Sequence, residues 1–185
     1  MHTVLGLAYV LPLVDRIRSP GPPRFTAGKE DIEMSAETTC LMCVQEECAE
    51  DMVLFRDDLW AGEIVPGMDV PGWIVLRARR HAELITGLND AELASLGRRA
   101  RDLTAAVAEV TGAPATYMMA FGENHKHYHA LITARGDDVP ADRRRGKILQ
   151  LAGERVDSRA AAALVPAVAA AYQRYATGPA AEEVG

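Results

Sequence analysis

Three of the five histidines of this chain fall in one short run, His125, His127 and His129, separated by Lys126 and Tyr128. If the run is a β-strand, its alternate side chains share one face, so all three imidazoles line one surface. Imidazole is a competent nucleophile that titrates near neutrality, and each ring placed in a core would need hydrogen-bond partners. The run therefore predicts a reactive or ligand-binding surface. The alternative is an exposed histidine run that binds metal ions adventitiously.

The three cysteines, Cys40, Cys43 and Cys48, also lie close together. One of them would stay unpaired in any disulfide scheme, and Cys40 and Cys43 have the C-x-x-C spacing with which two thiolates bind one zinc ion. The alternatives are a redox pair or reduced cysteines packed as small apolar groups. Thiols of this kind are typical of a reducing compartment, so we expect a cytoplasmic protein. Cys48 has no assigned role.

Short apolar runs bounded by Gly, Pro and Asp predict the strands that must position these side chains. The candidate strands are 52–55, 60–65, 73–78, 115–121 and 127–133. Between the third and fourth strands we expect one long helix over 89–110, because Asn89 and Glu92 form a capping box and Gly112 follows the apolar stripe. A second, alanine-rich helix is expected beyond residue 157. This order predicts an α+β fold: an antiparallel sheet with one long helix and a C-terminal helical segment.

The length of 185 residues predicts one domain with appended ends. We expect an N-terminal extension over 1–37, a core domain over 38–152 and a C-terminal helical tail over 153–185. The extension contains a proline-rich stretch that disfavours regular structure. It is either a flexible natural segment or lies upstream of a native start near Met34.

Composition excludes several classes of function. With 49% hydrophobic and 25% charged residues the chain is typical of a globular protein, and its net charge of −6 disfavours a nucleic-acid coat. No segment is long enough to span a bilayer, and the apolar run 4–14 lacks the basic residues that precede a signal peptide's core. Six Lys and Arg against three Asp over 125–147 could still attract a small anionic substrate.

Residues 125–135 (HKHYHALITAR) resemble the alternating-histidine signature of the histidine-triad (HIT) superfamily. Residues 71–81 (PGWIVLRARRH) resemble the strand and basic turn that precede the long helix in that superfamily, and the helix and two later strands follow in the same order. The resemblance covers roughly residues 40–150. It departs at Lys126, where an apolar residue is usual, and in the missing glycine-glutamine-serine segment before the histidines.

The resemblance implies a nucleotide phosphohydrolase or nucleotidyltransferase that acts at the α-phosphate of a nucleotide or another phosphorylated small molecule. His127 would be the nucleophile that forms a covalent nucleotidyl-histidine, and His129 would contact the phosphate or assist the leaving group. Asn124 and Glu63 would bind substrate, Glu63 at the ribose hydroxyls. The alternatives are an enzyme that keeps the scaffold but performs divergent chemistry in a specialised pathway, and a non-catalytic zinc-stabilised nucleotide-binding module.

Some members of the superfamily bind zinc through an N-terminal C-x-x-C, a later histidine and the first histidine of the triad. By that resemblance the ligands here are Cys40, Cys43, His81 and His125, and the zinc is structural. Homodimers are common in the superfamily, so we expect one here. We expect no nucleic-acid or membrane partner.

Overall fold

The computed structural model describes residues 40–178. The chain divides into two units, Met1–Glu33 and Met34–Gly185, and every element below belongs to the second. The expected N-terminal extension over 1–37 and the candidate start at Met34 lie outside the described residues. In the described part, no helix is long and apolar enough to cross a bilayer.

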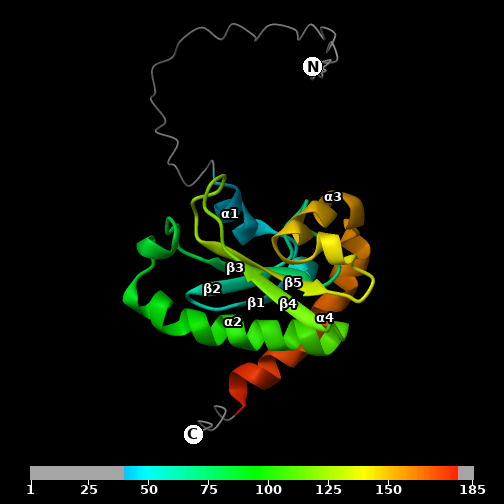
Figure 1. Cartoon of the computed structure of the whole chain (residues 1–185). Coiled ribbons are helices and arrows are strands. Elements are labelled where there is room, and N and C mark those ends of the chain that lie inside the picture. The colour runs from blue at the N-terminus through cyan, green and yellow to red at the C-terminus, as the bar shows by residue number, and fades with distance from the viewer. Residues whose placement is uncertain (1–39, 179–185) are drawn as a thin grey trace, which may run out of the picture. The chain divides into compact units, whose positions relative to one another are not determined.

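Five antiparallel strands form one sheet in the order β1-β2-β3-β5-β4 (Figure 1). Their bounds are β1 Val53–Arg56, β2 Trp60–Glu63, β3 Trp73–Ala78, β4 Ala115–Met119 and β5 His129–Arg135. The first three strands form the predicted meander, and β5 then pairs with β3 on one side and β4 on the other. Because Arg77 lies opposite His129 in the β3–β5 pair, the end of β3 stands beside the histidine run.

Two long helices cover one face of the sheet (Figure 1). Helix α2, Asp90–Thr111, begins with the expected capping box: the Asn89 side chain accepts from the Glu92 amide, and the Glu92 carboxylate accepts from the Asn89 amide. It ends at Gly112, whose φ of 62° favours a residue without Cβ. Helix α4, Ser158–Thr177, packs against α2. The predicted α+β class, with a long helix and a C-terminal helix, is confirmed.

Alternate residues of β3 are buried on opposite faces of the sheet. Ile74 and Leu76 belong to the core beneath α2 and α4, whereas Trp73 and Val75 pack on the other side. That other side is covered by a 3-10 helix, Arg145–Leu151, followed by α3, Ala152–Arg155. The remaining short elements are α1 Leu41–Val44 and the 3-10 helices Gln45–Glu47, Glu50–Met52, Ile85–Gly87 and Ala141–Arg143.

The histidine run is only partly a strand, which corrects the expectation of one strand over 127–133. Strand β5 begins at His129, and His127 forms an isolated bridge with Glu83. The reason is that the backbone before β5 pairs with the turn that follows β3: the amide of Leu84 donates to the carbonyl of Lys126 (2.7 Å). As a result His127 is buried, His129 is half-buried and His125 is exposed.

Candidate metal centre and histidine site

Cys40, Cys43, His81 and His127 converge on one point, and one nitrogen or sulfur atom from each lies within 4.8 Å of all the others. Sγ of Cys43 lies 3.3 Å from Nδ1 of His81 and 3.4 Å from Nδ1 of His127. Sγ of Cys40 lies 3.5 Å from the same nitrogen of His127. The four side chains form a group that could hold a metal ion.

The donor set fits zinc. Zinc–sulfur bonds of about 2.3 Å and zinc–nitrogen bonds of about 2.0 Å in a tetrahedron put neighbouring S and N atoms roughly 3.5 Å apart. The three S···N distances of 3.3–3.5 Å match that edge. Two thiolates and two imidazoles would fill all four positions, which is typical of a structural rather than a catalytic zinc site.

Three segments far apart in sequence supply these side chains. Cys40 is the N-cap of α1 and Cys43 lies within it, and the amide of Val44 donates to the carbonyl of Cys40 (3.2 Å), so one helical turn brings both sulfurs to the same side. His81 lies just beyond the end of β3, and His127 precedes β5. Because β3 and β5 are neighbours, the two histidines meet with their ring centroids 5.0 Å apart.

The structure brings His127 to the cysteines in place of the expected His125. Of the two, only His127 lies on the backbone that pairs with residues 82–84 beside His81, and it is 1% exposed. His125 is exposed, and its ring centroid lies 6.4 Å from that of His129. The resemblance therefore supplied three of the four clustered residues, and the fourth is displaced by two positions along the run.

Both ring nitrogens of His127 are engaged. Its Nε2 donates to the carbonyl of Ala78 (2.7 Å), while its Nδ1 faces the two cysteine sulfurs. Burial lowers the pKa of His127 below its ordinary value, and this effect outweighs the Ala78 hydrogen bond, which raises it. In the neutral ring, which burial favours, Nε2 carries the proton and Nδ1 the lone pair that a metal ligand requires, and the carbonyl fixes the orientation of the ring.

His129 is arranged differently. Its Nδ1 donates to the carbonyl of His127 (2.8 Å), so in the neutral ring Nε2 carries the lone pair. The side chain is half-buried and lines two hollows in the surface. A histidine nucleophile needs a ring that is held in place and keeps one lone pair, and His129 meets both conditions in the lining of a cavity.

The two hollows share His129, His125 and Phe121 in their lining. The first, which we call the α1 hollow, has a volume of about 310 Å³ and is bounded by Leu41, Met42 and Gln45. The second, the turn hollow, has a volume of about 320 Å³ and lies between residues 84–86 and the segment 120–129. Each is within the size range of a small-molecule subsite.

Glu63 does not line either hollow. Its side chain is fully buried and accepts a hydrogen bond from Nε of Arg77 at 2.5 Å, with Arg56 3.8 Å away. Arg77 is also fully buried and bonds Glu46 at 3.0 Å. The carboxylate of Glu63 is therefore held in a structural ion pair.

The Glu63–Arg77 pair belongs to a larger network of ion pairs, which joins the segment after Cys43 to the sheet. Glu46, three residues after Cys43, accepts hydrogen bonds from Arg77 and Arg79 of the β3 region. The hydrogen bond from Arg79 is the main cause of a lowered pKa of Glu46, opposed by burial. Cys48 belongs to this network, because Nη2 of Arg56 donates to its Sγ at 3.0 Å. It is not one of the four residues of the metal cluster.

The sequence did not predict this ion-pair network, because the spacing of its acidic residues and arginines matches no known motif. The one available signal was the alternation of Arg77 and Arg79 in an otherwise apolar strand region. Asn124, expected to contact substrate, is exposed in the loop before His125 and lines neither hollow.

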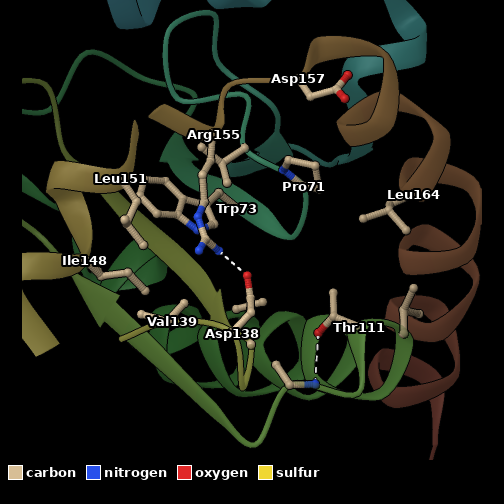
Figure 2. A pocket seen from close by; sticks show the side chains of 15 residues that line it. Pro71, Trp73, Thr111, Asp138, Val139, Ile148, Leu151, Arg155, Asp157 and Leu164 are labelled. Atoms are coloured by element: carbon tan, nitrogen blue, oxygen red, sulfur yellow. Dashed lines mark hydrogen bonds and ion pairs between the residues drawn. The ribbon is translucent and has the colours of Figure 1, made fainter. Parts of the chain in front are cut away.

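A third and larger hollow lies at the other end of the sheet (Figure 2). It has a volume of about 560 Å³, and Figure 2 shows Trp73, Leu151 and Leu164 around it, with Arg155 bonded to Asp138 at 2.6 Å. No histidine or cysteine of the described residues lines it. We therefore place the candidate chemistry at the histidine site.

No protein-family model and no curated protein matches the sequence. Solved structures do match the fold. A hypothetical histidine triad nucleotide-binding protein from Sulfolobus tokodaii is 13% identical, with a TM-score of 0.58 over 77% of this chain and 100% of that one. A Zn-bound histidine triad family protein from Mycobacterium smegmatis is 15% identical, with a TM-score of 0.55 over 72% and 95% of the two chains.

A uridylyltransferase is 19% identical, with a TM-score of 0.55 over 73% of this chain and 45% of that one. This chain therefore spans less than half of that enzyme. At such identities the matches establish a common fold. The expected HIT-like fold is confirmed.

Proposed function

We propose that this chain, which has the histidine-triad fold, is a nucleotide hydrolase or nucleotidyltransferase that works through a covalent intermediate on His129. The observation that carries the proposal is the hydrogen bond from Nδ1 of His129 to the carbonyl of His127, which leaves Nε2 basic beside two hollows. The fold supports this class of activity, since one structural neighbour is a uridylyltransferase. Another is a diadenosine triphosphate hydrolase from Plasmodium falciparum (10% identical, TM-score 0.53, over 70% of this chain and 82% of that one).

This proposal moves the nucleophile from His127, where the sequence resemblance put it, to His129. A nucleophilic ring needs one nitrogen with an available lone pair. The nitrogens of His127 face the cysteines and the Ala78 carbonyl, and the residue is 1% exposed. His129 has the same kind of backbone restraint but is half-buried and lines both hollows, whereas His127 lines the turn hollow alone.

In the proposed reaction, Nε2 of His129 attacks the α-phosphorus of the substrate. A P–N bond to His129 forms as the bond to the leaving group breaks, and the leaving atom takes the electron pair. His125 is exposed, its ring centroid lies 6.4 Å from that of His129, and it gives that atom a proton. Water or an acceptor then attacks phosphorus and gives its proton to His125, while the P–N bond breaks and Nε2 of His129 recovers its lone pair.

We propose a structural zinc ion on Cys40, Cys43, His81 and His127. It would tie the α1 segment to the sheet, and so fix Leu41, Met42 and Gln45 as a wall of the α1 hollow. It would also hold His127, whose carbonyl orients His129. The zinc would thus preorganise the site without contacting the substrate.

The test measures transfer of a nucleotidyl group to the protein. The protein is incubated briefly with an adenylated substrate, and its intact mass is then measured by mass spectrometry. Wild type should gain one adenylyl group and release adenosine monophosphate. His129→Ala should do neither, yet retain one zinc per chain. His127→Ala should lose the zinc, which separates the two roles. Equal turnover by wild type and His129→Ala would overturn the assignment.

A further inference from the structure

We propose that the third hollow (Figure 2) is a second ligand site and that it takes a small organic amine, in which a protonated ammonium group is attached to an apolar body. We call it the helix-end hollow, because the last turn of α2 forms one of its sides. Its volume of about 560 Å³ lies within the range of small-molecule pockets. None of its lining residues lines the α1 hollow or the turn hollow, so the inference does not depend on the proposed reaction.

The helix-end hollow combines a rigid base with accessible apolar sides. Trp73 and Ile148 line it and are 2% and 0% exposed, because they belong to the core between the sheet and the segment that covers it. Close-packed side chains of this kind move little, so the hollow keeps its shape without a ligand. The surface that a ligand can meet includes the half-buried side chains of Pro71, Val110 and Leu164. An apolar ligand body that covers them gains the free energy of removing apolar surface from water.

The charges that line the helix-end hollow favour a cation. Two carboxylates, of Asp138 and Asp157, stand against one guanidinium, of Arg155, which leaves one negative charge in excess. Nη1 of Arg155 lies 2.6 Å from Oδ2 of Asp138, so the guanidinium already has a partner. Within residues 40–178, Oδ1 of Asp138 and Oδ2 of Asp157 accept no hydrogen bond, and both residues are exposed. Each carboxylate can therefore accept a hydrogen bond from a protonated amine.

The end of helix α2 adds to this preference. Val110 and Thr111 of its last turn line the hollow, and that turn contains no basic side chain. The last carbonyl groups of a helix have no partner within it and carry partial negative charge, which favours a cation nearby. The amino-terminal end of α4 would favour an anion, but it is already capped, because Oδ1 of Asp157 accepts from the amide of Ala160 at 2.9 Å. The negative helix end is thus the one left for a ligand.

Two other classes of ligand fit the helix-end hollow less well. A bare metal ion lacks ligands there, because the cysteine–histidine cluster is the one group of three or more potential metal ligands in the described part of the chain. An organic anion would pair with Arg155 only in competition with Asp138, and it would also face Asp157 and the end of α2. An amine with an apolar body matches the apolar sides and the excess negative charge together.

The two tryptophans of the chain provide a test with an internal control, because each contributes one indole N–H signal to a proton–nitrogen NMR spectrum. Trp73 lines the hollow, whereas Trp60 does not, and the indole N–H of Trp60 donates to Ser95 at 2.9 Å. Phenethylamine added to the full chain should shift the Trp73 signal saturably, with a Kd of about 1 mM or lower, and leave the Trp60 signal in place. Phenylpropanoate has the same ring and a carboxylate in place of the ammonium group, and it should bind at least about tenfold more weakly. Equal binding of the two compounds, or a Trp73 signal that neither one shifts, would overturn the inference.

The residue test compares Asp138→Asn with Asp137→Asn. Each substitution removes one exposed carboxylate and its ion pair with an arginine, since Asp137 lies 3.5 Å from Arg135, but Asp137 does not line the hollow. Asp138→Asn should weaken phenethylamine binding by about fivefold or more, and Asp137→Asn by less than about twofold. An unchanged affinity in Asp138→Asn, with the Trp60 signal showing that the variant is folded, would overturn the inference. A Trp73 signal that moves with protein concentration in the absence of amine would also overturn it, because the hollow would then be an interface between copies of the chain.

Discussion

The carbonyl of His127 accepts a hydrogen bond from Nδ1 of His129 at 2.8 Å, while the ring of His127 faces the cysteines of the candidate metal centre. One residue therefore joins the two halves of the site. Its side chain is buried with the metal-binding group, and its backbone orients the imidazole that reaches the hollows. In the proposed reaction, this link would make the reactivity of His129 depend on the stability of the metal centre.

Loss of the metal centre should therefore affect both stability and turnover. In the double variant Cys40→Ser, Cys43→Ser, we expect zinc content to fall from one per chain to none and the free energy of unfolding to drop by several kcal/mol. A displacement of His129 on the order of 1 Å would lower kcat about 10²-fold. Metal analysis, chemical unfolding and kinetics on one preparation measure all three.

Cys48→Ser is the control for that experiment, because Cys48 contacts Arg56 and lies outside the metal cluster. Its zinc content should equal that of wild type. Zinc retained by the double variant, or lost from Cys48→Ser, would contradict the assigned ligands.

Much of the fold follows from local sequence signals. The capping box at Asn89 and Glu92 and the glycine at 112 predict the limits of α2 to within a residue or two, since both act through nearby backbone groups. The meander of β1 to β3 follows from short apolar runs between turn residues. These features depend on neighbours in sequence, so the sequence alone predicts them.

The histidine run was harder to predict because its conformation depends on a distant turn. Alternation placed His125, His127 and His129 on one face, but residues 82–84 pair with residues 126–128 and delay the start of β5. That pairing, between segments more than forty residues apart, buries His127 and exposes His125. The burial of Glu63 was also not predicted, since an acidic side chain is usually exposed. It is fully buried because its partner Arg77 comes from the adjacent strand.

The Glu63–Arg77 pair yields a prediction about stability. Both side chains are fully buried, so removal of one charge leaves the other without its main partner in a low-dielectric region. Glu63→Gln should lower the free energy of unfolding by about 3 kcal/mol, measured from the urea midpoint.

A surface ion pair provides the comparison. Arg143 and Glu154 lie 2.9 Å apart with both side chains partly exposed, so Arg143→Met should change stability by less than about 1 kcal/mol. Similar losses for Glu63→Gln and Arg143→Met would show that burial does not govern the first pair.

Glu46 should make stability depend on pH. The hydrogen bond that Glu46 accepts from Arg79 is the main reason why its pKa lies below the ordinary value of 4.5. Burial acts in the opposite direction and raises the pKa. A carboxylate with a lowered pKa contributes stability that is present above its unfolded pKa and lost as pH falls through its folded pKa. The difference in Tm between wild type and Glu46→Gln should therefore be constant near pH 6 to 7 and shrink below about pH 4.5.

Using the difference between the two proteins removes the effect of metal loss in acid, which both share. Arg79→Met should reproduce most of the Glu46→Gln effect, because the two side chains bond each other. A Tm difference that grows as the pH falls would contradict the expected sign of this dependence.

Helix α4 should be an integral part of the fold rather than a dispensable tail. The ring of Tyr172 is 1% exposed and stacks on Phe55 of β1 with centroids 4.1 Å apart, and its hydroxyl accepts from Arg99 of α2 at 2.9 Å. Tyr172→Ala should lower the free energy of unfolding by about 3–5 kcal/mol, because it removes a large buried ring. Tyr172→Phe keeps the stack and should lose only about 1 kcal/mol.

Tyr175, which is 39% exposed on the same helix, is the matched control site. In urea unfolding, Tyr175→Ala should lower the free energy of unfolding by much less than Tyr172→Ala does. Equal losses at the two positions would mean that α4 does not anchor the sheet through Tyr172.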